Sequence, residues 1–223
     1  VFNRAIEENV VSKEKNPFEQ FKVSKFNTKT KKRALTKEDM MKIITTETIQ
    51  ATTLRTFTRD VFTFAYLCGG ISFVDMANLT LDNIYKERIR YIRQKTHGEI
   101  NLKLCDQAKE IIEKYISYRE KATYLFPILD ARLHKTPMQK KNRVRKVLAR
   151  INKELKVLAS ELEIKTDVTT YVARHSFASI LKNTGVNIAL ISQALGHQDI
   201  KTTEIYLSKF DDKQMDEAMS NLL

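Results

Sequence analysis

Three residue types that together could act on a phosphodiester lie in a short stretch of the sequence. The run from Tyr171 to Ala178 contains Arg174, a Leu-Gly-His turn ends at His197, and Tyr206 follows nine residues later. A tyrosine hydroxyl can attack phosphorus and split one difficult exchange into two easier steps through a covalent intermediate. An arginine fork can hold the non-bridging oxygens, and a histidine can donate or accept a proton. The set is suited to phosphoryl transfer.

Each of these residues, taken alone, also has a purely structural explanation. A single tyrosine on an amphipathic helix is most often a core or rim residue. Gly196-His197 after an apolar helix is typical of a helix C-cap, and Arg174 could form a structural ion pair. The combination and its spacing, rather than any single residue, indicate a site.

Residue types and spacings together resemble the tyrosine recombinase (phage integrase) family. Its hallmarks are an Arg-His-Ser/Thr-Phe-Ala helix, a Leu-Gly-His turn and a tyrosine nine residues later. The resemblance covers about residues 35–210, and Ser72–Ala77 and Tyr171–His175 look most like the integrases of Bacteroides-type mobile elements. It implies a mainly α domain with a small β hairpin or sheet (α+β). It also implies a site-specific DNA recombinase, an integrase or invertase, that cuts and rejoins DNA through a 3′-phosphotyrosine.

The resemblance assigns roles to individual positions. Tyr206 would be the nucleophile, Arg174 would hold the transition-state charge, and His197 would contact the phosphate or take the tyrosyl proton. Lys95, between two expected strands, lies where the family keeps the lysine that protonates the leaving oxygen. Because bond energy is conserved in the phosphotyrosine, neither a nucleotide nor a metal cofactor is expected.

One departure from the family pattern concerns the position three residues before Arg174. The family has histidine there and this chain has Tyr171, whose phenol can hydrogen-bond a phosphate but is a poorer proton carrier at neutral pH. His175 is no simple substitute, because a neighbouring helix residue faces about 100° away.

A second departure concerns the first arginine of the family. It normally follows the Gly-apolar pair after the long apolar helix, where this chain has Ser72. Losing one guanidinium costs about 2–4 kcal/mol of transition-state stabilisation. Arg59 is the nearest upstream arginine that could compensate, and a surface pair with Asp60 is the alternative interpretation. A recombinase-fold protein that binds DNA without turnover is therefore the alternative function, and a type IB topoisomerase is a third.

The charge distribution indicates a polyanionic partner. Lys and Arg total 39 against 27 Asp and Glu, a net charge of +12, which favours double-stranded DNA. Two segments are rich in Lys and Arg, and both are expected to contact DNA. For the second segment, the alternative interpretation is a helix face that is merely exposed to solvent. The expected DNA contacts are Lys31, Lys32, Arg33, Lys140, Lys141, Arg143 and Arg145.

Composition and missing motifs narrow the class further. Hydrophobic residues make up 42% and charged residues 30%, which excludes disorder over the whole length. No apolar run approaches membrane-spanning length, and no secretory signal is visible. Two cysteines exclude a disulfide framework, and there is no P-loop or paired-cysteine metal motif. We expect a bacterial cytoplasmic protein associated with the nucleoid, with no membrane or metal partner.

Changes in hydrophobic periodicity and charge along the sequence suggest that the chain has three parts. Residues 1–15 resemble the end of a helix and would be the C-terminal remnant of an upstream core-binding domain. Residues 16–34 would be a basic linker, and residues 35–223 the catalytic domain. An amphipathic helix over 212–223 is expected to dock on a neighbouring subunit, within a tetramer on DNA. Further elements are expected over these residues: helices 36–47, 52–67, 72–77, 106–121, 137–162, 168–183, 188–195 and 202–209, and strands 88–94 and 99–104.

Overall fold

The chain divides into two compact units, residues 1–32 and 33–223. The computed structural model describes residues 2–17, 34–46, 53–117 and 123–207, without the side chains of Thr53, Ser117, Ile205 and Tyr206. The first unit holds α1 (Phe2–Glu7) and the 3-10 helix η1 (Lys13–Lys15). The single helix expected to residue 15 is wrong, because α1 ends at Glu7 and Asn9 adopts a φ of 54°. Its origin in an upstream domain stays a prediction.

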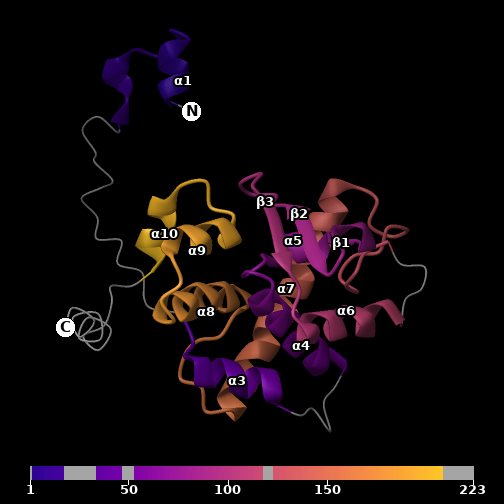
Figure 1. Ribbon diagram of the computed structural model, residues 1–223. Helices are drawn as coiled ribbons and strands as arrows, with labels where there is room; N and C mark the ends of the chain where they lie inside the picture. The colour runs from indigo at the N-terminus through magenta and orange to yellow at the C-terminus, as the bar shows by residue number, and fades with distance from the viewer. Residues whose placement is uncertain (1, 18–33, 47–52, 118–122, 208–223) are drawn as a thin grey trace, which may run out of the picture. The chain divides into compact units, whose positions relative to one another are not determined.

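The second unit is mainly helical with one small sheet, which confirms the predicted class (Figure 1). In chain order its elements are α3 (Lys37–Thr45), α4 (Thr53–Leu67), α5 (Phe73–Ala77), η3 (Leu81–Asn83), β1 (Ile84–Tyr85), β2 (Arg88–Ile92), β3 (Glu99–Lys103), α6 (Asp106–Ser117), α7 (Pro137–Glu161), α8 (Thr170–Asn183), α9 (Ile188–Leu195) and α10 (Ile200–Tyr206).

Local sequence signals explain where several helices begin and end. The Thr36 side chain accepts a hydrogen bond from the Asp39 amide at 3.1 Å and caps α3. Thr136 caps α7 in the same way, ahead of Pro137 at the first helical position. After α4, Gly69 and Gly70 adopt φ values of 70° and 66°, and the chain turns sharply toward α5.

The sheet is antiparallel in the order β1-β2-β3. The expected hairpin is confirmed, with Ile89 opposite Leu102 and Tyr91 opposite Ile100. The third strand, β1, was not expected, because two residues are too short for an alternating pattern to show. It pairs Ile84 with Ile89 and widens the hairpin into a sheet.

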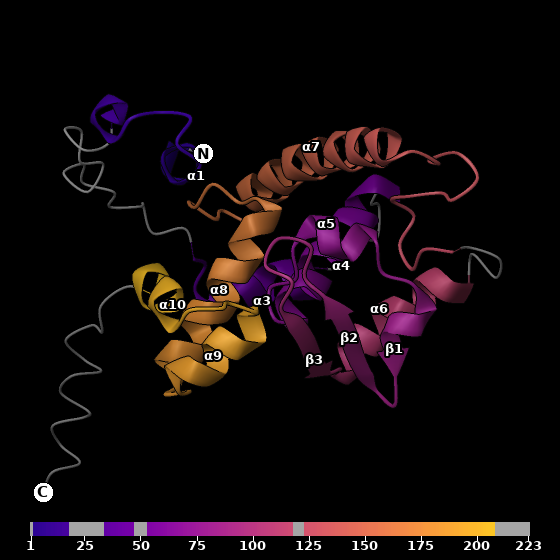
Figure 2. The same cartoon turned by 90° about the horizontal axis from the view of Figure 1, so that it is seen from above.

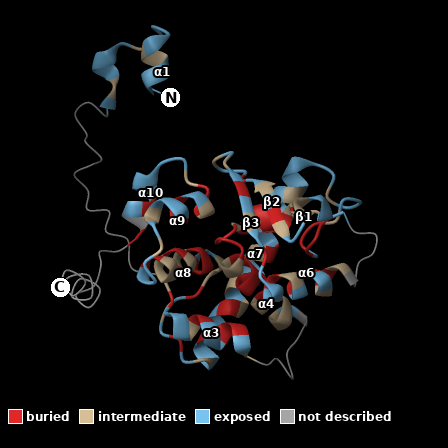
Figure 3. Ribbon diagram, viewed as in Figure 1, coloured by how far each residue is buried: buried red, intermediate tan, exposed pale blue. Residues whose placement is uncertain are grey.

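Two groups of buried side chains hold this unit together. The main core gathers around α4 and includes Phe62, Phe64 and Phe126, while α7 runs along one side of it (Figure 2). A separate C-terminal cluster consists of Ala178, Ile191, Leu195 and Leu207. Figure 3 shows buried residues along α4 and α8. Helix α8 packs on both α4 and α9, and α9 packs on β3, so α8 joins the two groups.

The part of the chain that the structure describes contains no helix long and apolar enough to cross a membrane.

Candidate active site

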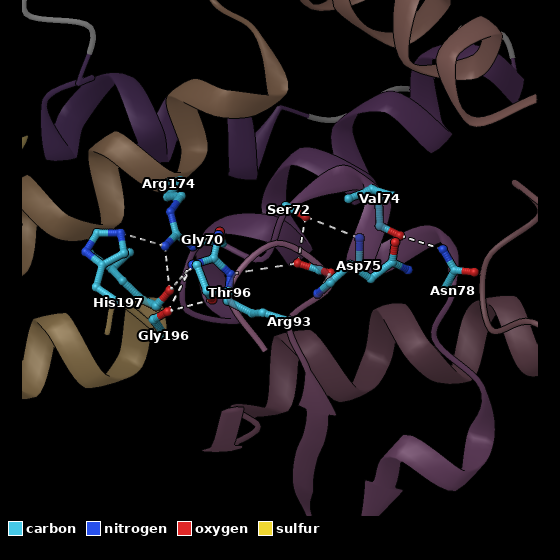
Figure 4. Close-up of polar contacts among 12 residues, drawn as sticks. Gly70, Ser72, Val74, Asp75, Asn78, Arg93, Thr96, Arg174, Gly196 and His197 are labelled. Carbon is cyan, nitrogen blue, oxygen red and sulfur yellow. Dashed lines mark hydrogen bonds and ion pairs between the residues drawn. The ribbon is translucent and has the colours of Figure 1, made fainter. Parts of the chain in front are cut away.

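Arg174 lies where the main core meets the C-terminal cluster. It projects from α8, is 4% exposed, and donates from Nη1 to the Gly70 carbonyl at 2.9 Å. Its Nη2 donates to the Leu195 carbonyl at the end of α9 (Figure 4). One guanidinium thus connects the turn after α4 with the last turn of α9, and both contacts fix its plane.

Two glycines make room for this arrangement. A Cβ on Gly70 would lie 2.7 Å from the Cα of Arg174, and a Cβ on Gly196 would lie 2.7 Å from the Cδ of Arg93. Both glycines also have positive φ, and Gly196 is the left-handed C-cap of α9. The Gly-His pair therefore ends a helix, as the structural explanation expected. The missing side chain of Gly196 also leaves room for the side chain of Arg93.

A second arginine, Arg93, shares the Leu195 carbonyl with Arg174. It is 6% exposed, and its Nη1 donates to Leu195 O at 3.0 Å and to Gly196 O at 3.1 Å. Arg93 was not among the site residues expected from the sequence. Strand alternation was the available signal, because it puts position 93 on the inward face with Ile89 and Tyr91. Ile92 between them is 66% exposed.

A buried carboxylate, Asp75, lies beside Arg93. Its Oδ2 is 3.9 Å from the Arg93 Nε, and its Oδ1 accepts from the Gln94 amide at 2.9 Å. Ser72, which stands where the family has its first arginine, donates to Asp75 at 2.7 Å and caps α5. The Ser72 hydroxyl therefore helps to hold the carboxylate that neighbours Arg93.

His197 completes the cluster, and its two hydrogen-bond partners show which ring nitrogen carries the proton. Nε2 lies 3.1 Å from the Arg174 Nη2, which can only donate, so Nε2 accepts. Nδ1 lies 2.8 Å from the Thr203 hydroxyl. Burial, together with the charges of Arg174, Arg93 and Lys95, lowers the pKa of His197 to about 4. The ring is therefore neutral at pH 7 and carries its proton on Nδ1.

The turn that contains Lys95 is tied to the Leu-Gly-His turn. Thr96 Oγ1 donates to the Gly196 carbonyl at 3.1 Å, and Gln198 Nε2 donates to the Thr96 carbonyl at 2.7 Å. Lys95 itself is exposed, and it is close enough for its charge to lower the pKa of His197. The structure thus brings Lys95, Arg174 and His197 to one place.

The remaining predicted site residues lie in different settings. The side chain of Tyr206 lies outside the described residues, although its backbone ends α10. Tyr171 is 51% exposed, and its ring packs edge-on against the His175 ring, with 4.8 Å between the ring centres. Arg59 pairs with Asp60 and donates to the Thr46 carbonyl at 2.7 Å, at the connection between α3 and α4. Arg93, not Arg59, is the arginine that accompanies Arg174.

The predicted DNA-contacting cations fall into three groups. Lys31, Lys32 and Arg33 lie outside the described residues. Lys141 and Arg145 are exposed on α7. Arg143 donates to the Ile128 carbonyl at 3.0 Å, and the Lys140 ammonium lies 5.7 Å from the centre of the Tyr124 ring, so both also contact the loop before α7.

The cluster has the electrostatics of an anion site. Two buried guanidinium groups converge on one carbonyl, and Asp75 lies beside Arg93 as a counter-charge. Like charges held together at low dielectric repel, so an anion between them would relieve the repulsion. In chemical terms, the arrangement can hold a phosphate beside a neutral imidazole and a lysine.

The fold and this cluster define a class. The helical unit with its small antiparallel sheet has the fold of tyrosine recombinase catalytic domains. The Tn1549 transposon integrase bound to circular intermediate DNA matches it with a TM-score of 0.66 at 17% identity, over 100% of this chain and 76% of that one. The XerA recombinase crystal structure matches with a TM-score of 0.60 at 20% identity, over 84% of this chain and 62% of that one.

Sequence comparison gives the family. Residues 33–213 match the model of the phage integrase family, and the chain belongs to that family. Tyrosine recombinase XerD of Brucella suis biovar 1 (strain 1330) is 31% identical over 126 residues, which are 53% of this chain and 37% of the relative. Tyrosine recombinase XerC of Thermodesulfovibrio yellowstonii is 27% identical over 63% of this chain and 46% of the relative. The chain thus spans less than half of these relatives.

Proposed function

We propose that this chain is the catalytic part of a site-specific DNA recombinase that cuts and rejoins DNA through a 3′-phosphotyrosine at Tyr206. One observation carries the proposal: the buried guanidinium groups of Arg93 and Arg174 meet at the Leu195 carbonyl, beside a neutral His197. Relatives named tyrosine recombinases and neighbours solved on DNA support it.

In this mechanism the two arginines bind the scissile phosphate. Their N–H donors stabilise the charge that grows on the non-bridging oxygens as Tyr206 attacks. The phosphate takes over the Arg174 donor that Nε2 of His197 accepts in the DNA-free protein, and the Tyr206 proton passes to this free Nε2 while the oxygen–phosphorus bond forms. The bond from phosphorus to the 5′ oxygen breaks, and that oxygen takes its proton from Lys95. Rejoining reverses these steps with a new 5′ hydroxyl.

Arg93 replaces the first arginine of the family as the second positive group of the site. Ser72 is uncharged, but its hydroxyl donates a hydrogen bond to Asp75, and Asp75 lies beside Arg93. A carboxylate at this place partly balances the charge of a buried guanidinium. The second positive group therefore comes from the end of β2 rather than from the start of α5.

Wider DNA contacts would come from the basic segments. Lys141 and Arg145 on α7, with Lys140 and Arg143 beside them and Lys31, Lys32 and Arg33 upstream, would track the phosphates. Tyr171 would add a phenol hydrogen bond at the edge of the site. In this proposal the protein works as a tetramer on DNA, the 212–223 segment docks on a neighbouring subunit, and the setting is the bacterial nucleoid.

A suicide substrate tests the proposal. The substrate is a duplex that contains the recombination site with a nick next to the scissile phosphate. Cleavage releases the short fragment that carries the new 5′ hydroxyl, so rejoining is blocked and a covalent protein–DNA adduct accumulates. We expect an adduct with the wild-type chain and none with Tyr206→Phe, at equal DNA binding. The control is Tyr85→Phe, a change of an exposed tyrosine on β1. Tight binding without any adduct would establish the alternative, a DNA-binding protein without turnover.

A further inference from the structure

Thr203 occupies an unusual place in α10. It is fully buried, it lies three residues before Tyr206, and its hydroxyl is 2.8 Å from the Nδ1 of His197. Its carbonyl accepts the Leu207 amide at 2.9 Å, and Leu207 belongs to the C-terminal cluster. One residue thus connects the helix of the expected nucleophile with the imidazole of the site.

The direction of this hydrogen bond follows from the other side of the ring. Arg174 donates to Nε2, so the neutral imidazole must carry its proton on Nδ1 and donate it to Thr203. Both ring nitrogens then have a partner. Since the two partners differ in chemical type, the ring can neither flip nor change tautomer without losing one of these bonds.

Two other buried threonines show that a buried threonine hydroxyl in this fold does not require a hydrogen-bond partner. Thr58 is fully buried and Thr63 is 3% exposed, both on α4. Within the described residues, neither hydroxyl has a hydrogen-bond partner. The fold therefore tolerates a buried threonine without a bond, and the contact of Thr203 with His197 calls for an explanation of its own.

We propose that Thr203 is a positioning residue that accepts the Nδ1–H of His197 and holds the ring in place, with the acceptor Nε2 facing the arginines. The role in catalysis rests on the proposed function, in which Nε2 takes the Tyr206 proton. Thr203 also makes the orientation of the ring depend on the place of α10. If α10 moves, Nδ1–H loses its acceptor and this hydrogen bond no longer holds the ring in place.

Nitrogen NMR of the DNA-free protein tests the tautomer directly. Two-bond ¹H–¹⁵N spectra distinguish a protonated from an unprotonated ring nitrogen, and His197→Gln assigns the signals. We expect Nδ1–H for wild-type His197 and for Thr203→Ser, which retains the hydroxyl. In Thr203→Val the Nδ1–H loses its acceptor, so this proton should exchange faster with water and its resonance should broaden or disappear. The matched control, Thr58→Val, makes the same change at a buried hydroxyl that has no partner.

Adduct formation on the suicide substrate tests the catalytic consequence. We expect Thr203→Val to slow the adduct about tenfold or more while DNA affinity stays unchanged. Thr203→Ser and Thr58→Val should stay close to wild type. Thr203→Ala serves as a second variant if Thr203→Val does not fold, as judged by circular dichroism.

Each result has a defined meaning. An Nδ1–H resonance that is unchanged in Thr203→Val overturns the proposal, as does a Thr203→Val rate equal to that of Thr58→Val. If the wild-type chain forms no adduct, the proposed function fails, whereas the Nδ1–H resonance in the DNA-free protein still decides whether Thr203 holds the ring. The two failures are therefore distinguishable.

Discussion

The main core and the C-terminal cluster stabilise the two sides of the site very differently. Around α4, many large side chains are fully buried, among them Phe62, Phe64 and Phe126. The cluster that supports α9 and α10 has only Ala178, Ile191, Leu195 and Leu207 as buried apolar residues among those described. Burying a Leu or Ile side chain stabilises by about 1.5–3 kcal/mol, so α10 is held far less firmly than α4.

This difference separates what the site keeps fixed from what it can move. Arg93 and Asp75 belong to elements that pack on the main core, and Arg174 reaches from α8 to the Gly70 carbonyl. His197 directly follows α9, and α10, which ends at Tyr206, packs on α9. The groups that would bind phosphate are thus rigid, whereas the helix of the proposed nucleophile is supported by the small C-terminal cluster. Such regions of low local stability are where functional movements occur.

Removing the link between the two regions should have the largest effect. Arg174→Ala takes away a phosphate ligand and the donor to Gly70, so we expect adduct formation to fall about 10²–10³-fold. Arg174→Lys should not restore it, because one ammonium cannot reproduce a planar fork with contacts on two carbonyls and a ring nitrogen. Single-turnover rates on the suicide substrate measure both. Near-normal rates in Arg174→Ala would show that the link is unimportant.

A smaller change at the same link is Gly70→Ala. The new Cβ would meet the Arg174 backbone at 2.7 Å in a residue with positive φ, so we expect a loss of about 2–4 kcal/mol in the free energy of unfolding. Gly185→Ala is the matched control. Gly185 also has positive φ, at 80°, but nothing lies within 4 Å of its added Cβ. Its cost should be only the strain of about 1–2 kcal/mol. Equal losses by urea denaturation would contradict a close-approach role.

Hydrogen exchange measures the opening free energies of the two regions in the unmodified protein. Amides in α9 and α10 should exchange at least about tenfold faster than those in α4, which equals about 1.4 kcal/mol in opening free energy. Leu195→Ala should accelerate α9 and α10 further and leave α4 as it was. If α4 and α10 open together, the two regions form one cooperative unit and the comparison fails.

The smallest effect should come from pH. The pKa of His197 is lowered from 6.5 to about 4, so between these values the unfolded chain binds a proton that the folded chain does not. Its contribution to stability is therefore complete above about pH 6.5 and is lost as the pH falls toward 4. In His197→Gln this part of the pH dependence should disappear from urea midpoints measured between pH 4 and 7. An unchanged slope would mean that His197 titrates normally.

The sequence predicted the architecture where local chemistry decides it. Thr36 and Thr136 are strong N-caps, paired glycines end α4, and apolar alternation marks β2 and β3. It failed for β1, which has only two residues and depends on pairing with β2. It also extended the first helix too far, because the Phe2–Val10 spacing resembles a buried stripe although Val10 is 72% exposed.

The site was predictable only in part, for a related reason. A motif identifies Arg174 and His197, but the partners of these residues come from distant segments that only the folded chain brings together. Arg93 is 102 positions from Leu195, whose carbonyl it contacts. Arg59 was a plausible substitute by its place in sequence, whereas the structure commits it to Asp60. Strand alternation at position 93 was the one local sign of a buried arginine.

Removing the charge of the scissile phosphate tests whether the guanidinium groups of the site balance that charge. A suicide substrate with a methylphosphonate at that position has one non-bridging oxygen replaced by a neutral methyl group. If Arg93 balances the phosphate charge, Arg93→Ala should lower adduct formation about 10²–10³-fold on the natural phosphate and much less on the methylphosphonate. An equal loss on both substrates would contradict the account, because Arg93 would then act on the fold and not on the phosphate.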